Sequence, residues 1–257
     1  MSSIREDIKR VDQQNLFSSL FFPLLFLLVI WMVKIWETVM GVSFVHFGVY
    51  PGRLEGLLGV LFYPLIHGSW NHLLSNSTAL FLLSVGIFYF YRPVAYRIYF
   101  WTYLMSGIWI WVSARASYHI GSSGLIYGFA AFIFFSGIIR QNTNLLALSM
   151  LVTFLYGGMV WGIFPILPNM SYEGHLWGAI AGIILAIYFR KEGPQKKVYS
   201  WELEEEEARR KLDEIEDAEE VDDAEEIEIT RRESINPLIN QPKIVYTYKK
   251  KDEGEKS

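Results

Sequence analysis

The first apolar run of this chain most strongly limits what it can fold into. Residues 16–33 contain no charged side chain, and a helix of this length, at about 1.5 Å per residue, nearly covers the roughly 30 Å hydrocarbon core of a bilayer. Backbone amides in lipid must find partners within a helix or a closed barrel, and the apolar stretches lack strand-like alternation. The sequence therefore predicts an all-α membrane protein, a bundle of six transmembrane helices at 16–33, 71–91, 98–113, 123–139, 145–163 and 173–189.

A cleavable signal peptide is the alternative interpretation of the first run. The run is long, contains Pro23 and is not followed by a small-x-small cleavage pattern. We therefore expect it to be retained as the first helix, after a cytoplasmic N-terminal segment at residues 1–15.

Lysine and arginine residues fall mostly on one side of the predicted bundle. With the N-terminus inside, the outer loops hold only Lys34, Arg53 and Arg115, and the remaining basic residues up to Lys197 lie in inner segments. Basic loops favour the cytoplasmic side, so both termini are expected to be cytoplasmic. The chain shows no transit peptide pattern, which favours a bacterial cytoplasmic (inner) membrane over a mitochondrial one.

The composition changes after Arg190. Residues 1–190 hold ten basic and six acidic residues, whereas residues 191–257 hold thirteen and twenty-one. We expect 16–190 to be the six-helix membrane domain and 191–257 to be an acidic, largely mobile cytoplasmic tail with a short helix within 201–229. The negative charge argues against nucleic acid and anionic lipid as partners and leaves docking of a cytoplasmic protein open. The chain has no cysteine, which excludes a thiol nucleophile.

Polar side chains gather at the outer ends of three predicted helices. His72 and Asn76 lie four residues apart on one helix and therefore share a face. Ser123 begins a second helix, and His175 lies at the start of a third. A lone polar residue in a membrane helix usually caps a helix or links two of them, but ionisable groups there are costly and usually functional. Three polar helix ends at one depth favour a catalytic site.

The residue types at these ends suit hydrolysis of an acyl bond. A serine hydroxyl becomes a nucleophile when a base removes its proton, and neutral imidazole can act as that base, so we assign these roles to Ser123 and His175. His72, the Asn76 amide and the Ser123 backbone amide are candidate donors to the oxyanion. Tyr127, one turn after the serine, is expected to stack on the His175 ring. The aspartates ahead of the tail all precede the first predicted span, which favours a Ser-His dyad over a triad.

Glycines repeat every four residues in the two helices that carry the serine and the histidine. Gly124 and Gly128 lie in one helix, and Gly174, Gly178 and Gly182 lie in the other. Such small-residue faces let helix backbones approach closely. The repeat can serve packing alone, and the same packing would bring a short serine side chain within reach of the histidine.

Several of these motifs together resemble the rhomboid intramembrane serine proteases. Residues 121–124 read Gly-Ser-Ser-Gly and resemble their Gly-x-Ser-Gly signature, and residues 174–178 resemble their His-x-x-Gly helix. Residues 72–76 resemble their His-x-x-x-Asn element, residues 48–51 resemble a Gly-x-x-Pro loop, and Tyr127 matches a tyrosine four after the serine. The resemblance covers residues 16–190 in the family's order.

This resemblance implies an activity and a set of site residues. It implies an intramembrane serine endopeptidase with a Ser123/His175 dyad and an oxyanion site near His72 and Asn76. It further implies no metal and no cofactor, and transmembrane protein substrates that are cut near the outer face of the lipid bilayer. The supporting residues would be Gly121, Gly124, Tyr127 and Gly178. The first outer loop lacks the family's Trp-Arg pair, and the tail lies outside the family's core pattern.

Rival functions fit the residues less well. No histidine has the His-Glu-x-x-His partners of a metalloprotease, and the predicted spans hold no aspartate for an aspartyl protease. A proton relay through His72 and His175 would suit a transporter, but no inverted repeat is visible. The remaining alternative is a catalytically silent rhomboid-like protein that binds or escorts transmembrane clients. Such relatives usually lack the serine or the histidine, and both are present here.

Overall fold

The computed structural model describes residues 2–166, 171–195, 201 and 203–213, which are helical apart from loops and a single isolated bridge between Val49 and His119. They fall into two units, residues 1–197 and residues 198–257. The first unit contains all six apolar stretches. The predicted all-α class is therefore confirmed for the described residues.

Each apolar stretch contains one long helix. Three helical segments, Asn15–Met40, Trp70–Phe90 and Ser123–Arg140, are long and apolar enough to cross a membrane. The long helices are α1 (Ser2–Met40), α4 (Trp70–Phe90), α5 (Ala95–Ser113), α6 (Ser123–Arg140), α7 (Thr143–Tyr156) and α8 (Tyr172–Tyr188). Short helical turns, η1 (Val45–Phe47), α2 (Leu54–Leu57), α3 (Gly59–Phe62) and η2 (Tyr63–Leu65), form the connection between α1 and α4.

One predicted helix is shorter than expected. The stretch at 145–163 is α-helical only to Tyr156 and continues as the 3₁₀ segment η3 (Gly157–Ile163). This segment contains Gly157, Gly158 and Gly162, and glycine disfavours regular α-helix because it gains no side-chain packing and loses the most backbone entropy. The change of helix type places η3 over the start of α8, where one of its carbonyl groups reaches His175.

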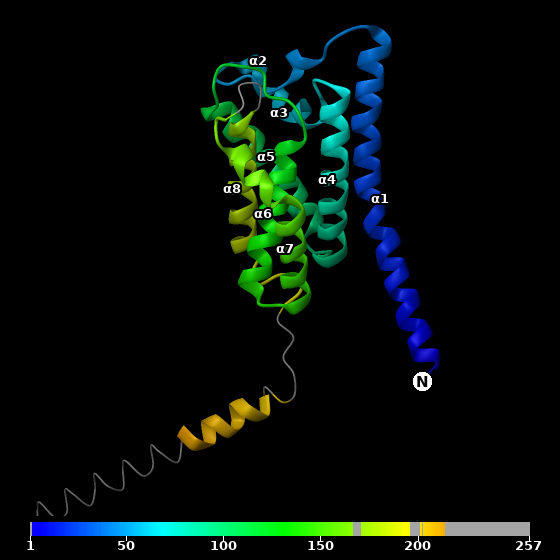
Figure 1. Cartoon of the computed structure of the whole chain (residues 1–257), viewed down its shortest axis with the longest axis vertical. Helices are drawn as coiled ribbons and strands as arrows, with labels where there is room; N and C mark the ends of the chain where they lie inside the picture. The colour runs from blue at the N-terminus through cyan, green and yellow to red at the C-terminus, as the bar shows by residue number, and fades with distance from the viewer. Residues whose placement is uncertain (1, 167–170, 196–200, 202, 214–257) are drawn as a thin grey trace, which may run out of the picture. The chain divides into compact units, whose positions relative to one another are not determined.

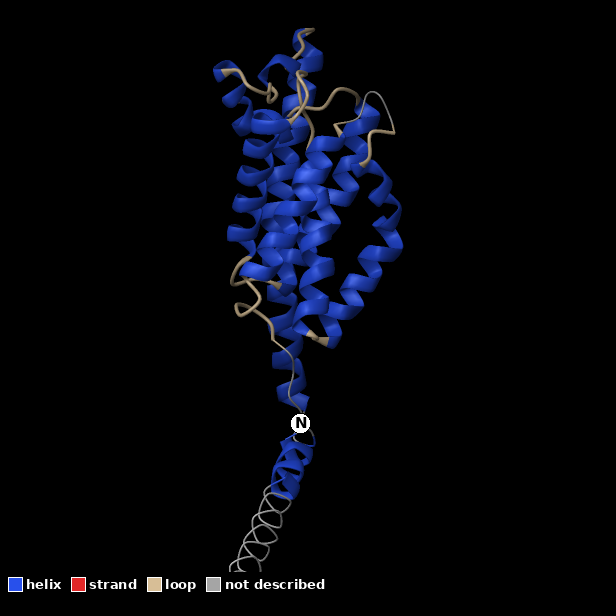
Figure 2. Ribbon diagram, turned by 90° about the vertical axis from the view of Figure 1, so that its left-hand side faces the viewer, coloured by secondary structure: helices blue, strands red, loops and turns tan. Residues whose placement is uncertain are grey.

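Helix α6 lies at the centre of the bundle. It contacts α4, α5, α7 and α8, which run alongside it (Figure 1). The loops gather at the two ends of the bundle (Figures 1 and 2). Phe129, Phe132 and Ile133 of α6 have no exposed surface. Helix α1 packs against α4 and leaves large apolar side chains exposed, as expected for a helix that faces lipid, among them Phe17, Phe21, Leu24 and Leu28.

Arg140, the last residue of α6, joins the C-terminal ends of α6 and α8. Its Nη2 donates to the Phe189 carbonyl at 2.5 Å, and its Nη1 donates to the carbonyls of Glu192 and Pro194 at 2.6 and 2.9 Å. Phe189 is the C-cap of α8, and its carbonyl also accepts the Glu192 N–H at 2.9 Å. One buried guanidinium therefore fixes the end of this helix pair that lies opposite Ser123.

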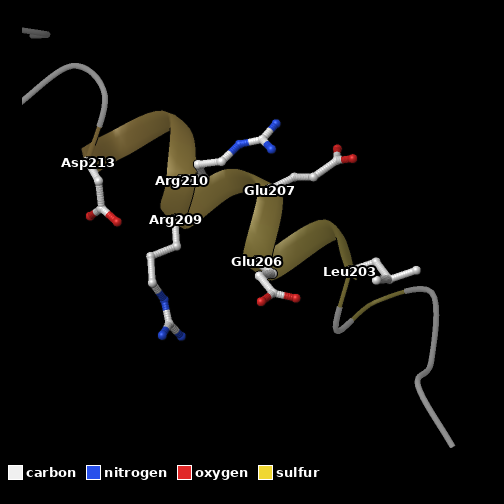
Figure 3. A pocket seen from close by; sticks show the side chains of 6 residues that line it. All are labelled: Leu203, Glu206, Glu207, Arg209, Arg210 and Asp213. Carbon is white, nitrogen blue, oxygen red and sulfur yellow. The ribbon is translucent and has the colours of Figure 1, made fainter.

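Residues 203–213 of the second unit form a helix within the stretch where the sequence predicts a short one. Figure 3 shows side chains on this helix around a shallow hollow, and all are exposed. A small-molecule pocket buries most of its ligand, so this open surface with charges of both signs is no such pocket. The expectations for residues 214–257 lie outside the described residues.

Candidate active site

The serine lies at the first position of α6, after a sharp turn. Gly121 has a φ of +102°, a conformation that side chains other than glycine rarely adopt. A Cβ atom at Gly121 would lie 2.9 Å from His72 Cε1 and 3.7 Å from Asn76 Nδ2. The missing side chain therefore lets the turn approach the polar face of α4. The Ser123 amide also belongs to the first turn of α6, where N–H groups lack intrahelical partners.

Ser123 and His175 are in hydrogen-bond contact across the α6–α8 interface. Ser123 Oγ lies 2.8 Å from His175 Nε2, and His175 Nδ1 lies 2.9 Å from the Gly162 carbonyl oxygen of η3. A carbonyl can only accept, so Nδ1 carries the proton and Nε2 is left as an acceptor for the serine hydroxyl. This is the arrangement a general base requires. The Tyr127 ring stacks on the imidazole with centroids 4.1 Å apart and an angle of 6° between the rings.

Close glycine packing produces this contact. A Cβ at Gly178 would collide with the Gly124 carbonyl oxygen and lie 2.8 Å from its carbon, and a Cβ at Gly182 would lie 2.9 Å from the Gly128 carbon. Side chains at these positions would force α6 and α8 apart. The short serine side chain reaches the imidazole because the two backbones touch, so the expected glycine stripe is found at this interface.

His72 and Asn76 of α4 lie beside the Gly121 turn. Ser69 caps α4 by accepting the His72 backbone N–H at 3.2 Å. The Asn76 Nδ2 donates to His67 Nε2 at 3.2 Å. The structure thus brings both predicted oxyanion residues to the turn that precedes Ser123. The Asn76 amide is hydrogen-bonded to a third histidine, His67.

His67 organises this side of the site. Its Nε2 accepts from the Ser122 backbone N–H at 3.4 Å and lies 3.3 Å from the Ser122 hydroxyl. The Lys34 ammonium of α1 donates to the His67 carbonyl at 2.9 Å and pairs with Glu37 at 2.7 Å. From sequence, His67 resembles a second histidine that rhomboid proteases often carry ahead of His72, and a structural role was expected for it. Lys34 and Glu37 were given no place in the site. The sequence signal for this contact was the pair of opposite charges at Lys34 and Glu37, three residues apart after the first apolar run.

Acid should weaken the fold through His67, which lies in the loop ahead of α4. Burial lowers its pKa to about 3, whereas an imidazole in an unfolded chain titrates near 6.5. Between these values the unfolded chain binds a proton that the folded protein does not. The free energy of unfolding therefore falls as the pH drops below about 6.5, by at most about 1.4 kcal/mol per pH unit, and is unaffected above it.

Thermal unfolding in detergent between pH 4 and 8 measures this effect. The His67→Gln variant cannot titrate, so its midpoint should depend less on pH than that of the wild type below pH 6.5. Parallel profiles for the two proteins would contradict the assignment. Both proteins share the other histidines, so the difference between the two profiles reports the titration of His67 alone.

The fold and the site define a class: an integral membrane protein of packed helices with a serine and a histidine in contact between two of them. Residues 54–192 match the family model of the Rhomboid domain, and the chain belongs to this family. The family resemblance drawn from the motifs is confirmed.

Similar proteins occur in bacteria and in a virus. Proteins of Mycobacterium bovis and Mycobacterium tuberculosis, both named as uncharacterized, are each 30% identical over 188 residues, which cover 68% of this chain and 75% of the relative. A protein of Acanthamoeba polyphaga mimivirus that is named as a rhomboid protein is 27% identical over 146 residues, covering 52% of this chain and 75% of the relative.

Proposed function

We propose that this protein is an intramembrane serine endopeptidase that cleaves transmembrane protein substrates near the outer face of the membrane. The observation that carries the proposal is the 2.8 Å contact between Ser123 Oγ and His175 Nε2, with Nδ1 held by a carbonyl. Membership of a family composed mostly of intramembrane serine proteases supports it. The proposal includes six membrane spans, cytoplasmic termini and a bacterial inner membrane.

The geometry supports a two-step acyl transfer. Ser123 Oγ attacks the scissile carbonyl while His175 Nε2 takes the hydroxyl proton, and the Gly162 carbonyl holds the Nδ1–H of the imidazolium that forms. The imidazolium then gives its proton to the leaving amine. In the second step His175 removes a proton from water, the hydroxide attacks the acyl-serine ester, and the serine regains its proton.

Charge on the carbonyl oxygen needs donors beside the serine. The Ser123 amide at the start of α6, the His72 ring and the Asn76 side chain lie around the Gly121 turn and are proposed to supply them. Each such donor is commonly worth a hundredfold or more in rate. His67 would hold the Asn76 amide in place through its Nε2.

A substrate helix must unwind before its peptide bonds can reach this site, because an intact helix shields them with side chains and hydrogen bonds. We therefore propose a preference for small or helix-breaking residues near the cut. The tail helix at 203–213 is proposed as the docking element for a cytoplasmic partner, since it exposes charges on all its turns.

The test is cleavage of two single-span substrates in proteoliposomes, one with glycines near the outer end and one with a uniform leucine span. Cleavage of the first, and slower cleavage of the second, is the expected result. Equal cleavage would refute the unwinding requirement. Binding of both substrates without any product would instead favour the alternative function, a catalytically silent rhomboid-like protein that escorts transmembrane clients.

A further inference from the structure

A second histidine–serine contact lies next to the first. His119 Nδ1 is 2.6 Å from Ser171 Oγ, and the His119 side chain is buried. His119 precedes Ser123 by four residues, and Ser171 precedes His175 by four residues. The two contacts therefore join the same two segments of chain at two points, and the mechanism above uses only one of them.

The partners of the His119 ring decide where its proton lies. His119 Nε2 is 3.1 Å from the Arg115 carbonyl oxygen, which can only accept, so Nε2 carries the proton and Nδ1 is an acceptor. The Ser171 hydroxyl must then donate to Nδ1. The lone pairs of the Ser171 hydroxyl oxygen remain free to accept a backbone N–H. Ser171 is the N-cap of α8, and its Oγ accepts the Gly174 N–H at 3.4 Å.

The backbone of His119 is itself held in place. Its N–H donates to the Val49 carbonyl at 2.8 Å, and its carbonyl accepts the Val49 N–H at 3.0 Å. Beside it, the Arg115 Nε lies 3.5 Å from a Glu173 carboxylate oxygen, which also accepts the Arg115 N–H at 3.4 Å. The backbone that carries the His119 imidazole is therefore fixed by its bonds to Val49. The ring contacts Ser171, the N-cap of the helix that carries His175.

We propose that His119 and Ser171 are positioning residues that hold the start of α8 in register with the start of α6, and so set the distance between Ser123 and His175. The inference rests on the proposed function for its kinetic consequences. The N–H groups in the first turn of α8 have no partners within the helix, so the residues of this turn would fray or shift if the cap were lost. Displacements of about 1 Å in a catalytic contact can cost about a hundredfold in rate.

Two substitutions of His119 separate positioning from simple packing. Asn places its Oδ1 acceptor where Nδ1 lies, so His119→Asn keeps the bond to Ser171. Gln places its amide nitrogen near Nε2, so His119→Gln keeps only the bond to the Arg115 carbonyl. Both remove the ring. We expect His119→Gln and Ser171→Ala to lower kcat by about ten- to a hundredfold with KM within about twofold, and His119→Asn to stay within about threefold of the wild type.

Coupling between the partners gives a second kinetic criterion. The double variant His119→Gln/Ser171→Ala should lose no more activity than Ser171→Ala alone, because Ser171→Ala already removes the bond that His119→Gln breaks. Ser113→Ala, an exposed serine at the end of α5, is the matched control and should leave kcat unchanged. Equal losses in His119→Asn and His119→Gln, or multiplicative losses in the double variant, would overturn the proposal.

Amide hydrogen exchange at residues 172–176 tests the link without any substrate. Faster exchange in His119→Gln and Ser171→Ala than in His119→Asn supports it, and unchanged exchange in all three refutes it. Labelling of Ser123 by a fluorophosphonate reports the serine separately. A wild type that neither cleaves nor reacts would defeat the proposed function, and the exchange data would still decide whether the two residues hold α8.

Discussion

Replacing Ser123 by alanine should abolish cleavage of a transmembrane substrate, and replacing His175 should do nearly the same. Ser123 Oγ supplies the attacking oxygen and His175 Nε2, 2.8 Å away, removes its proton. Loss of either leaves only binding and the oxyanion donors, so we expect the rate to fall by about ten-thousandfold or more. The Ser123→Ala/His175→Ala double variant should be no slower than the single variants, because the two groups act as a unit.

The measurement is single-turnover cleavage in proteoliposomes at matched amounts of folded protein. Ser75→Ala and His46→Ala are suitable controls, because both residues are exposed and lie outside the contact network of the site. Thermal unfolding of each variant separates a chemical defect from a folding defect. Residual cleavage within tenfold of the wild type in Ser123→Ala would show that another nucleophile acts.

The helices and the two central residues could be predicted from local sequence. Apolar stretches predict membrane helices because the requirements for such a helix are local. Each side chain must face lipid or a packed neighbour, and each backbone amide bonds to a carbonyl four residues away. Ser123 and His175 were identified because each begins such a helix within a glycine-rich motif. The glycine repeats in both helices then predicted that the two helices pack closely together.

The remaining parts of the site depend on contacts that no local pattern encodes. The end of α7 at Tyr156 and the Gly162 carbonyl on His175 arise where η3 folds back over α8. The bond between His119 and Ser171 joins residues 52 positions apart, and that between Lys34 and His67 joins residues 33 positions apart. Loop residues of this kind acquire partners only after the helices have packed, so a single sequence does not reveal them.

Gly178→Ala, in α8, should impair cleavage more than an equally disruptive change at the α6–α7 interface. The added Cβ would collide with the Gly124 carbonyl oxygen and lie 2.8 Å from its carbon, so α8 must move away from α6 by about 1 Å to restore an ordinary contact. The fold should lose about 1–3 kcal/mol of stability. The larger effect is on chemistry, because the same shift lengthens the bond between Ser123 and His175, and kcat should fall by about a hundredfold.

Gly137→Ala is the matched control for this prediction. Its Cβ would collide with the Ser149 hydroxyl and lie 2.7 Å from the Leu145 carbonyl oxygen, which places the strain between α6 and α7. We expect a similar loss of stability but nearly normal kcat for each folded molecule. Gly124→Ala should be milder than Gly178→Ala, since its nearest contact is 3.2 Å. If unfolding temperature and kcat fall together in Gly137→Ala as in Gly178→Ala, catalysis depends on the stability of the whole bundle, and the separation of α6 from α8 has no special role.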